Sequence, residues 1–170
     1  VEAVVGCKMT PIPSVHGKIS AGALSAYLTD MGSPHHSQPG LVALTQSTEV
    51  STVYTPEEIK AIVDVAHANG LFVHMDGARI ANAAVALGCD VRSFTKDLGV
   101  DMMSFGGTKN GMMMAESVVV FNKDFVRDFV TLRKQNLQLA SKMRFLAAQY
   151  IAYFKDGLWL ENARHANNMA

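Results

Sequence analysis

The sequence predicts a three-layer α/β/α domain with a mostly parallel sheet. Two short apolar runs point to this fold class, because each stops abruptly at polar and glycine residues. The first run, Leu71–Met75, leads into Asp-Gly-Ala-Arg79, and the second, Asp101–Phe105, leads into Gly-Gly-Thr-Lys109. Buried parallel strands look like this when they deliver side chains to the carboxyl edge of a sheet, where α/β proteins bind ligands.

A helix is predicted immediately before the first of these strands. Thr55-Pro-Glu-Glu58 has the pattern of a capping box with proline at the first helical position. The apolar face of the helix is expected to comprise Ile59, Ile62, Val63 and Ala66. Asn69-Gly70 ends the helix, and Leu41–Gln46 precedes it as a strand. The helix is therefore expected to be the right-handed crossover of a β-α-β unit.

The other elements follow from local patterns along the chain. We expect a short strand at 3–5, a helix at 21–28 capped by Ser20, a loop at 33–40, an alanine-rich helix at 80–87, a short helix or turn at 91–98 and a strand at 117–121. From Asp124 onward apolar residues recur at helical spacing, while the basic residues are expected to face solvent or another subunit.

The composition narrows the class of protein. Fifteen basic residues balance fifteen acidic residues with no basic block, which argues against a nucleic-acid partner or an anionic membrane. No apolar stretch has the length of a membrane span. Cys7 and Cys89 have no metal-ligand spacing, and the adjacent His35 and His36 lack a third donor, so no metal site is expected. We expect a cytoplasmic protein with free thiols.

Asp76 and Lys109 together match the requirements of pyridoxal phosphate. A lysine amine bonds the aldehyde of this cofactor, and a carboxylate facing the pyridine nitrogen keeps the ring able to accept electrons. Gly106 and Gly107 would let the backbone approach the cofactor closely. The spacing alone leaves a second interpretation open, in which Asp-Gly is a turn and Gly-Gly-Thr-Lys is an ordinary loop.

Two further polar residues have alternative roles. Gln46 follows the strand that begins at Leu41, so it is either a substrate neighbour or a residue that satisfies backbone groups of the adjoining loop. Arg79 lies three positions after Asp76, so it either points into the same pocket or forms a surface ion pair with Asp76.

Several segments closely resemble one enzyme family. They are His74–Ala83, Ser104–Gly111, His35–Pro39, Thr45–Glu49 and Thr52–Glu58. The sequence resembles the low-specificity L-threonine aldolases, pyridoxal-phosphate enzymes of the aspartate-aminotransferase fold type (fold type I), over nearly the whole chain. The resemblance implies that residues 1–170 are part of the large cofactor-binding domain, with an N-terminal part and the small C-terminal domain missing.

The resemblance also implies roles for individual residues. Lys109 would bond the cofactor covalently, Asp76 would face the pyridine nitrogen, and Arg79 would bind the substrate carboxylate. The remaining expected contacts are Ser104 and Thr108 for the cofactor phosphate or ring, and Gln46 for the substrate. His74 lies inside the strand and is expected to be a packed residue.

The implied reaction is cleavage of L-threonine, L-allo-threonine or a related β-hydroxy-α-amino acid to glycine and an aldehyde. The implied assembly is a homo-oligomer, a dimer or tetramer. Three alternatives stay open at this point: a phenylserine aldolase, a β-eliminating lyase, and a catalytically incompetent chain that only oligomerises.

Overall fold

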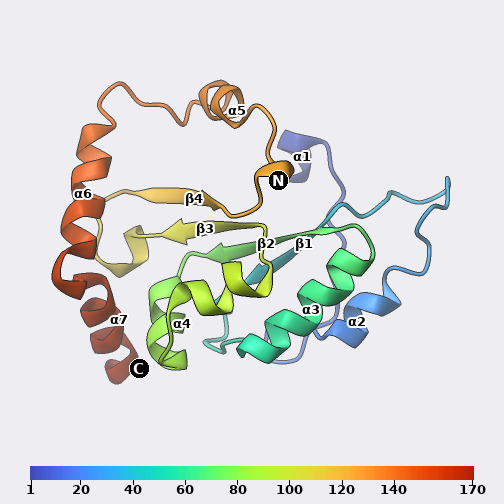
Figure 1. The fold of residues 1–170 in the computed structure, drawn as a ribbon, viewed down its shortest axis with the longest axis horizontal. Coiled ribbons are helices and arrows are strands. Elements are labelled where there is room, and N and C mark those ends of the chain that lie inside the picture. Colours follow the sequence, from blue (N-terminus) through green and yellow to red (C-terminus); the bar gives the residue numbers. More distant parts are fainter.

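The computed structural model describes residues 1–170 and contains one sheet flanked by helices (Figure 1). The strands are β1 (Leu41–Thr45), β2 (Phe72–Gly77), β3 (Met102–Gly106) and β4 (Glu116–Val120). The helices are α1 (Glu2–Val5), α2 (Ala21–Ala26), α3 (Pro56–Ala68), α4 (Ile80–Leu87), α5 (Phe129–Gln135), α6 (Arg144–Phe154) and α7 (Leu158–Met169). Short 3-10 helices are η1 (Val91–Phe94), η2 (Lys96–Leu98), η3 (Thr108–Asn110), η4 (Lys123–Phe125) and η5 (Lys155–Gly157).

The sheet has the strand order β1-β2-β3-β4. Strands β1, β2 and β3 run parallel, and β4 pairs antiparallel with β3 at the edge. This confirms the predicted α/β class and the mostly parallel sheet.

The predicted β-α-β unit is present. The Thr55 hydroxyl accepts a hydrogen bond from the Glu58 N–H, and the Glu58 carboxylate accepts one from the Thr55 N–H at 2.8 Å, which completes the capping box. The four apolar residues expected on one face of α3 are all buried. Burying this face against the sheet fixes how α3 connects β1 to the parallel strand β2.

The two faces of the sheet differ in burial. Helices α3 and α4 contribute to a core with the side chains of one face, which are Val42, Leu44, Val73, Met75, Met103 and Phe105. The alternate residues of the strands are half-buried or exposed, and they include Ala43, Thr45, His74, Asp76 and Ser104. Because side chains alternate along a strand, the polar residues of β2 and β3 lie on the more open face.

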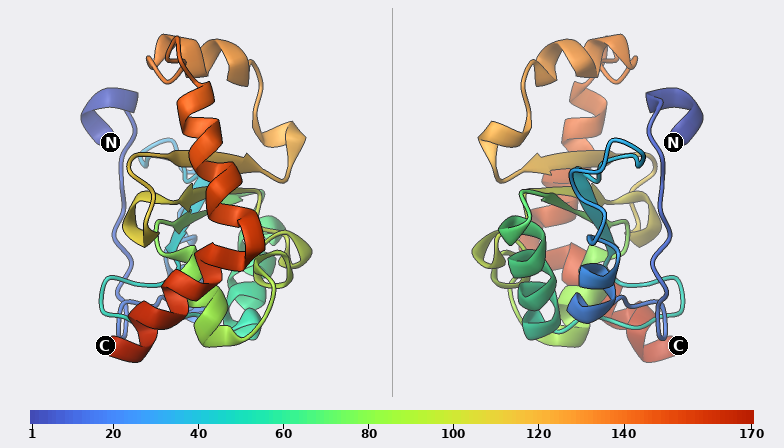
Figure 2. Two further views of the ribbon diagram at one scale, coloured as in Figure 1. Left: turned by 90° about the vertical axis from the view of Figure 1, so that its left-hand side faces the viewer. Right: turned by 90° about the vertical axis from the view of Figure 1, so that its right-hand side faces the viewer.

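Helices α6 and α7 pack along one end of the sheet (Figure 2). Phe105 lies within an aromatic cluster, with ring centroids 6.4 Å from Tyr150, 5.6 Å from Phe154 and 6.2 Å from Trp159. Helix α7 also packs against α4. This cluster ties the C-terminal helices to the strand that leads to Lys109.

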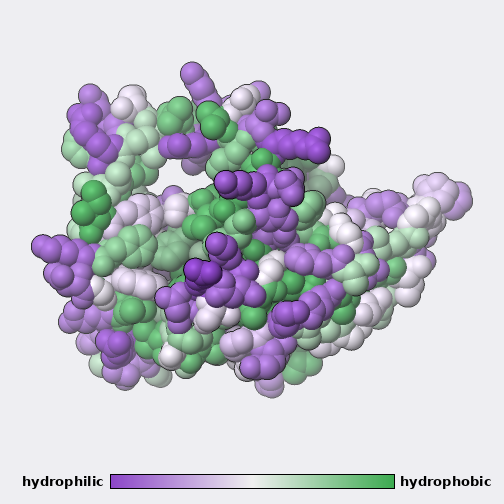
Figure 3. Space-filling model, in the orientation of Figure 1, coloured by the Kyte–Doolittle hydropathy of each residue, from purple (hydrophilic) through white to green (hydrophobic).

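Helix α5 packs loosely. None of its residues is buried, and Figure 3 shows an opening between α5, α6 and β4. Phe129 and Leu132 of α5 are 37% and 46% exposed. The segment predicted to be helical after Asp124 contains α5, α6 and α7, and of these three helices only α5 has no buried residue.

One predicted element is wrong. Residues 3–5 were expected to form a strand, and they lie instead in the single turn of α1. The Val5 N–H donates to the Val1 carbonyl at 3.1 Å, and the Gly6 N–H donates to the Glu2 carbonyl at 2.8 Å. A strand needs a hydrogen-bonded neighbour, and this exposed segment satisfies its backbone locally. Separately, no helix of the chain has the length and apolarity needed to cross a membrane.

Candidate active site

The carboxyl ends of β1, β2 and β3 bring three polar residues into line. Asp76 is paired in register with Thr45 on β1 and with Ser104 on β3. Paired residues of neighbouring parallel strands project from the same face, so these three side chains lie side by side. The Asp76 carboxylate accepts a hydrogen bond from the Ala78 N–H at 2.9 Å, which is its only bond within the chain. It is half-buried and keeps acceptor capacity for a ligand.

Glycines allow the end of β3, which leads to Lys109, to pack against the turn that follows Asp76 at the end of β2. A Cβ atom on Gly106 would lie 2.6 Å from the Cα and carbonyl oxygen of Ala78, and a Cβ atom on Gly77 would lie 2.5 Å from the Ser104 carbonyl oxygen. Both distances are far inside van der Waals contact. The end of β3 is therefore packed directly on the turn that follows Asp76. This contact fixes how the segment carrying Lys109 lies relative to Asp76.

Lys109 lies on η3, directly beyond β3, and its side chain is exposed. It forms none of the ion pairs found in the chain. The next residue, Asn110, is buried and anchors the turn. Its side-chain amide donates to the Tyr153 hydroxyl and to the Trp159 carbonyl at 2.8 Å, while its own carbonyl accepts from Asn162 at 3.0 Å. Lys109 thus has a free amine on a backbone held by α6 and α7.

Arg79 pairs with Glu49 and not with Asp76. Its two terminal nitrogens lie 3.0 and 3.4 Å from the two carboxylate oxygens of Glu49. The hydrogen bond and charge of Arg79 lower the pKa of Glu49, and the charge of Lys109 adds to this effect. The three charged side chains therefore share one end of the sheet. The surface ion pair considered between Asp76 and Arg79 does not form.

The other predicted residues make contacts within the protein. The Ser104 hydroxyl is 3.0 Å from Nε2 of His74, and the Thr108 hydroxyl accepts from the Ala115 N–H at 3.4 Å. The Gln46 amide is fully buried, and it both donates to the Tyr54 carbonyl and accepts from the Tyr54 N–H at 2.9 Å. Of the two roles that the sequence left open for Gln46, the structure contains the backbone-satisfying one.

Burial governs the protonation of His74. It lowers the pKa of the imidazole below 6.5, and the nearby Asp76 carboxylate partly opposes this effect. The predicted packed position of His74 is confirmed, with the addition that its ring bonds Ser104 on the neighbouring strand. Because burial disfavours the protonated imidazole, His74 contributes little positive charge beside the Asp76 carboxylate.

Sequence reasoning missed two residues of this region, Glu49 and Asn110. Glu49 ends the Thr-Gln-Ser-Thr-Glu segment directly after β1, so its position at the same sheet edge was a usable signal. The role of Asn110 had no signal in the sequence, because its partners lie on α6 and α7, more than forty residues further along the chain.

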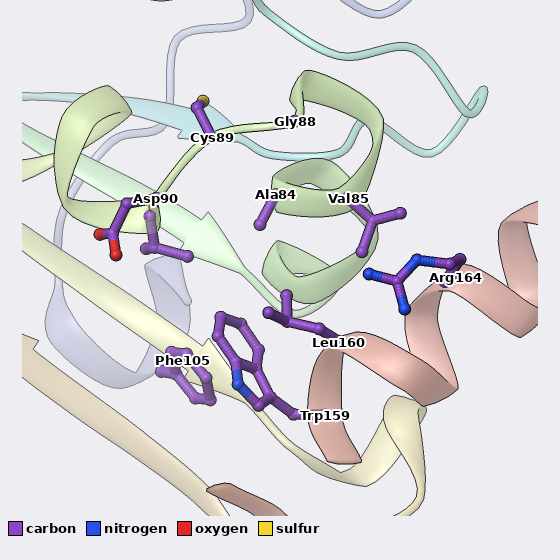
Figure 4. A pocket seen from close by; sticks show the side chains of 10 residues that line it. Ala84, Val85, Gly88, Cys89, Asp90, Phe105, Trp159, Leu160 and Arg164 are labelled. Atoms are coloured by element: carbon purple, nitrogen blue, oxygen red, sulfur yellow. The ribbon is translucent and has the colours of Figure 1, made fainter. Parts of the chain in front are cut away.

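One cavity of the molecule lies away from these residues. It has a volume of about 540 Å³ and lies between α4 and α7 (Figure 4). Phe105 contributes to its wall, and Phe105 projects from the face of β3 opposite to Ser104. A smaller cavity near His67 and Asp101 lies at the other end of the strands, where Asp101 precedes β3. The residues of the candidate site thus occupy the open sheet edge and line neither cavity.

The donor set fits pyridoxal phosphate. The cofactor needs a carboxylate for its ring nitrogen and an amine for its aldehyde. The Asp76 carboxylate can accept further hydrogen bonds, and the Lys109 amine is not engaged in an ion pair. Arg79 adds a guanidinium, the group best suited to bind a carboxylate with two parallel hydrogen bonds. We find no physical conflict between these residues and the cofactor.

A family comparison decides the relationship. The model of the β-eliminating lyase family matches residues 1–170. The chain belongs to this family. Two curated relatives are both named low-specificity L-threonine aldolase: one from a Pseudomonas species is 42% identical, and one from Pseudomonas aeruginosa is 44% identical. Each alignment covers 97% of this chain and 48% of the relative.

Solved structures agree with the family assignment. A threonine aldolase of Leishmania major superposes with a TM-score of 0.89 at 31% identity, over 96% of this chain and 48% of that one. A second structure, a putative L-allo-threonine aldolase of Listeria monocytogenes, has a TM-score of 0.65 at 18% identity over 88% of this chain and 40% of its own, and shows the shared fold. The chain spans about half the length of the curated relatives it matches.

Proposed function

We propose that residues 1–170 form part of the cofactor-binding large domain of a pyridoxal-phosphate-dependent aldehyde-lyase. The proposed reaction is cleavage of L-threonine or L-allo-threonine, or a related β-hydroxy-α-amino acid, to glycine and an aldehyde. The observation that carries the proposal is the identity of 42 to 44% over 97% of the chain to two low-specificity L-threonine aldolases. The placement of Asp76, Arg79 and Lys109 at one sheet end supports it.

Each residue has a distinct task in this proposal. Pyridoxal phosphate, when bound, supplies an aldehyde that condenses with amines and a ring that accepts the electron pair of a breaking bond. Asp76 holds a proton on the ring nitrogen, because a carboxylate at that position favours the protonated pyridine. Lys109 would be the residue that holds the cofactor, for which its exposed amine, which forms no ion pair, is suited.

Arg79 orients the substrate. A guanidinium that binds the α-carboxylate fixes the rotation of the Cα substituents relative to the ring. By fixing this rotation, Arg79 would favour cleavage between Cα and Cβ, the bond whose electron pair the cofactor would accept. We assign Ser104 and Thr108 to cofactor contacts through the bonding capacity that their hydroxyls retain, whereas the buried Gln46 amide supports the loop at this edge through its bonds to Tyr54.

The proposal is tested by trapping the cofactor on the chain. Pyridoxal phosphate is added, the visible spectrum is recorded, and borohydride reduction is followed by peptide mapping. We expect a pyridoxyl label on Lys109 and none in the variant Lys109→Ala, with Lys96 as the internal control because it is also a lysine in a 3-10 helix. Labelling spread evenly over surface lysines would refute the assignment. Aldehyde release from L-threonine is then measured by an alcohol dehydrogenase assay.

Substrate comparison separates the alternatives. Faster aldehyde release from phenylserine than from L-threonine would identify a phenylserine aldolase, and ammonia and a keto acid as products would identify a β-eliminating lyase. A chain that oligomerises but takes up no label on Lys109 would be the non-catalytic alternative.

We also propose a cytoplasmic homo-oligomer. The free cysteines and the exposed apolar residues Phe145 and Ile151 on α6, 61% and 73% exposed, support this assembly and location.

A further inference from the structure

The loop after β1 holds Glu49 in a defined place. Gln46, Ser47 and Thr48, the residues just before Glu49, are polar yet only 0%, 8% and 3% exposed. The Gln46 amide is bonded to the Tyr54 backbone, and the Thr48 hydroxyl is 2.7 Å from the hydroxyl of Thr52. Buried polar groups with satisfied hydrogen bonds restrict a loop to one conformation. The backbone of Glu49 is therefore fixed although its side chain is 75% exposed.

Glu49 contacts Arg79 as an amino-acid carboxylate would. Both of its oxygens face the two terminal guanidinium nitrogens, at 3.0 and 3.4 Å, which is the paired arrangement that arginine forms with carboxylate ligands. The charge of Lys109 also acts on Glu49. Of the two carboxylates at this end of the sheet, Glu49 and Asp76, only Glu49 is bonded to Arg79.

We propose that Glu49 occupies the carboxylate-binding position of Arg79 when no substrate is bound, and that the substrate carboxylate displaces it. This inference rests on the proposed role of Arg79 as the substrate's carboxylate ligand. The exposed Glu49 side chain can rotate into solvent when it is displaced. Glu49 then acts as an internal competitor, and it lowers the affinity for every ligand that must bind Arg79 through a carboxylate. Ligands without a carboxylate do not have to displace it.

The first test uses the chain without cofactor. Arg79 is modified with phenylglyoxal and quantified by peptide mapping, with acetate as a competing carboxylate. We expect Glu49→Gln to raise the modification rate of Arg79 about two- to fivefold and to lower the acetate concentration that protects it, as expected for loss of an exposed ion pair. The control Glu161→Gln removes the same charge from an exposed position on α7 and should match the unaltered chain. An unchanged rate in Glu49→Gln would overturn the inference.

The second test uses the cofactor-loaded protein. Glycine and glycinamide are titrated while the visible absorption is followed. Glu49→Gln is expected to lower the Kd of glycine about two- to fivefold and to leave that of glycinamide within about twofold. The gain in glycine affinity should vanish when Arg79→Gln is also present, because the guanidinium for which Glu49 and glycine compete is then missing.

The outcomes separate this inference from the proposed function. If Arg79→Gln weakens glycine binding but Glu49→Gln does not tighten it, the competition by Glu49 is wrong and the role of Arg79 stands. Weaker glycine binding in Glu49→Gln would show that Glu49 positions Arg79 and does not compete for it. If Arg79→Gln binds glycine as tightly as the unaltered chain, the role of Arg79 in the proposed function is wrong, and the inference falls with it.

Discussion

Replacing Gly106 by alanine is expected to disrupt the contact between the end of β3 and Ala78, in the turn that follows Asp76. The added Cβ atom would lie 2.6 Å from backbone atoms of Ala78, whereas ordinary contact begins at 3.4 Å. The two segments would therefore have to separate by about 0.8 Å (3.4 − 2.6), and no side chain can rotate to make room. Overpacking of this kind against backbone costs about 3 kcal/mol of folding free energy.

Urea unfolding followed by far-UV circular dichroism measures this cost. The matched control is Gly40→Ala, because a Cβ atom on Gly40 has nothing within 4 Å and the residue has no positive φ. We expect the control to change the free energy of unfolding by less than about 0.5 kcal/mol. A loss below about 1 kcal/mol in Gly106→Ala would show that the contact with Ala78 yields easily, and the reasoning would fail. Borohydride labelling of Lys109 is expected to fall in the same variant.

Two further predictions concern groups that support the site. Asn110→Ala removes the side-chain hydrogen bonds to the Tyr153 hydroxyl and the Trp159 carbonyl. The free energy of unfolding should therefore fall by about 2–4 kcal/mol. A urea midpoint equal to that of the unaltered chain would contradict this. The folded-state pKa of His74 lies below 6.5, so the unfolded chain binds more protons and stability should fall as the pH drops through 6.5 toward the folded pKa. His74→Gln should flatten this part of the profile of urea midpoint against pH, and an unchanged slope would assign the titration to other groups.

The sequence was sufficient for elements whose causes are local. The capping box at Thr55 and the apolar face of α3 each depend on residues a few positions apart, and both were predicted with the correct members. The strands β2 and β3 were recognisable because each is a short, largely apolar run that stops abruptly at polar and glycine residues. The prediction of a strand at 3–5 failed for the converse reason. The apolar composition of this segment is compatible with a strand, but a strand needs a hydrogen-bonded neighbour, and none of β1 to β4 pairs with it.

The site residues were predictable only as far as their strand positions. Asp76 was placed correctly at a sheet end because the position follows from its own strand. The partner of Arg79 was not, because Glu49 reaches it from a loop thirty residues earlier, and side-chain pairing over that separation leaves no periodic signal. Gln46 shows the same limit, since a polar residue at a strand end looks alike whether it faces a ligand or bonds Tyr54.

Gly106 and Gly107 show that a correct sequence signal can have a different structural cause. Their sequence pattern suggested a close approach of backbone to cofactor, and the structure supplies a different reason for each. A Cβ atom on Gly106 would collide with Ala78, and one on Gly107 would lie 2.9 Å from the Ala115 carbonyl and still closer to the Met112 sulfur. Both glycines are therefore required by packing within the protein itself. Because that packing sets the end of β3 against the Asp76 turn, it positions Lys109 without any contact to a ligand, and Gly106→Ala should impair cofactor attachment even though no cofactor contact is removed.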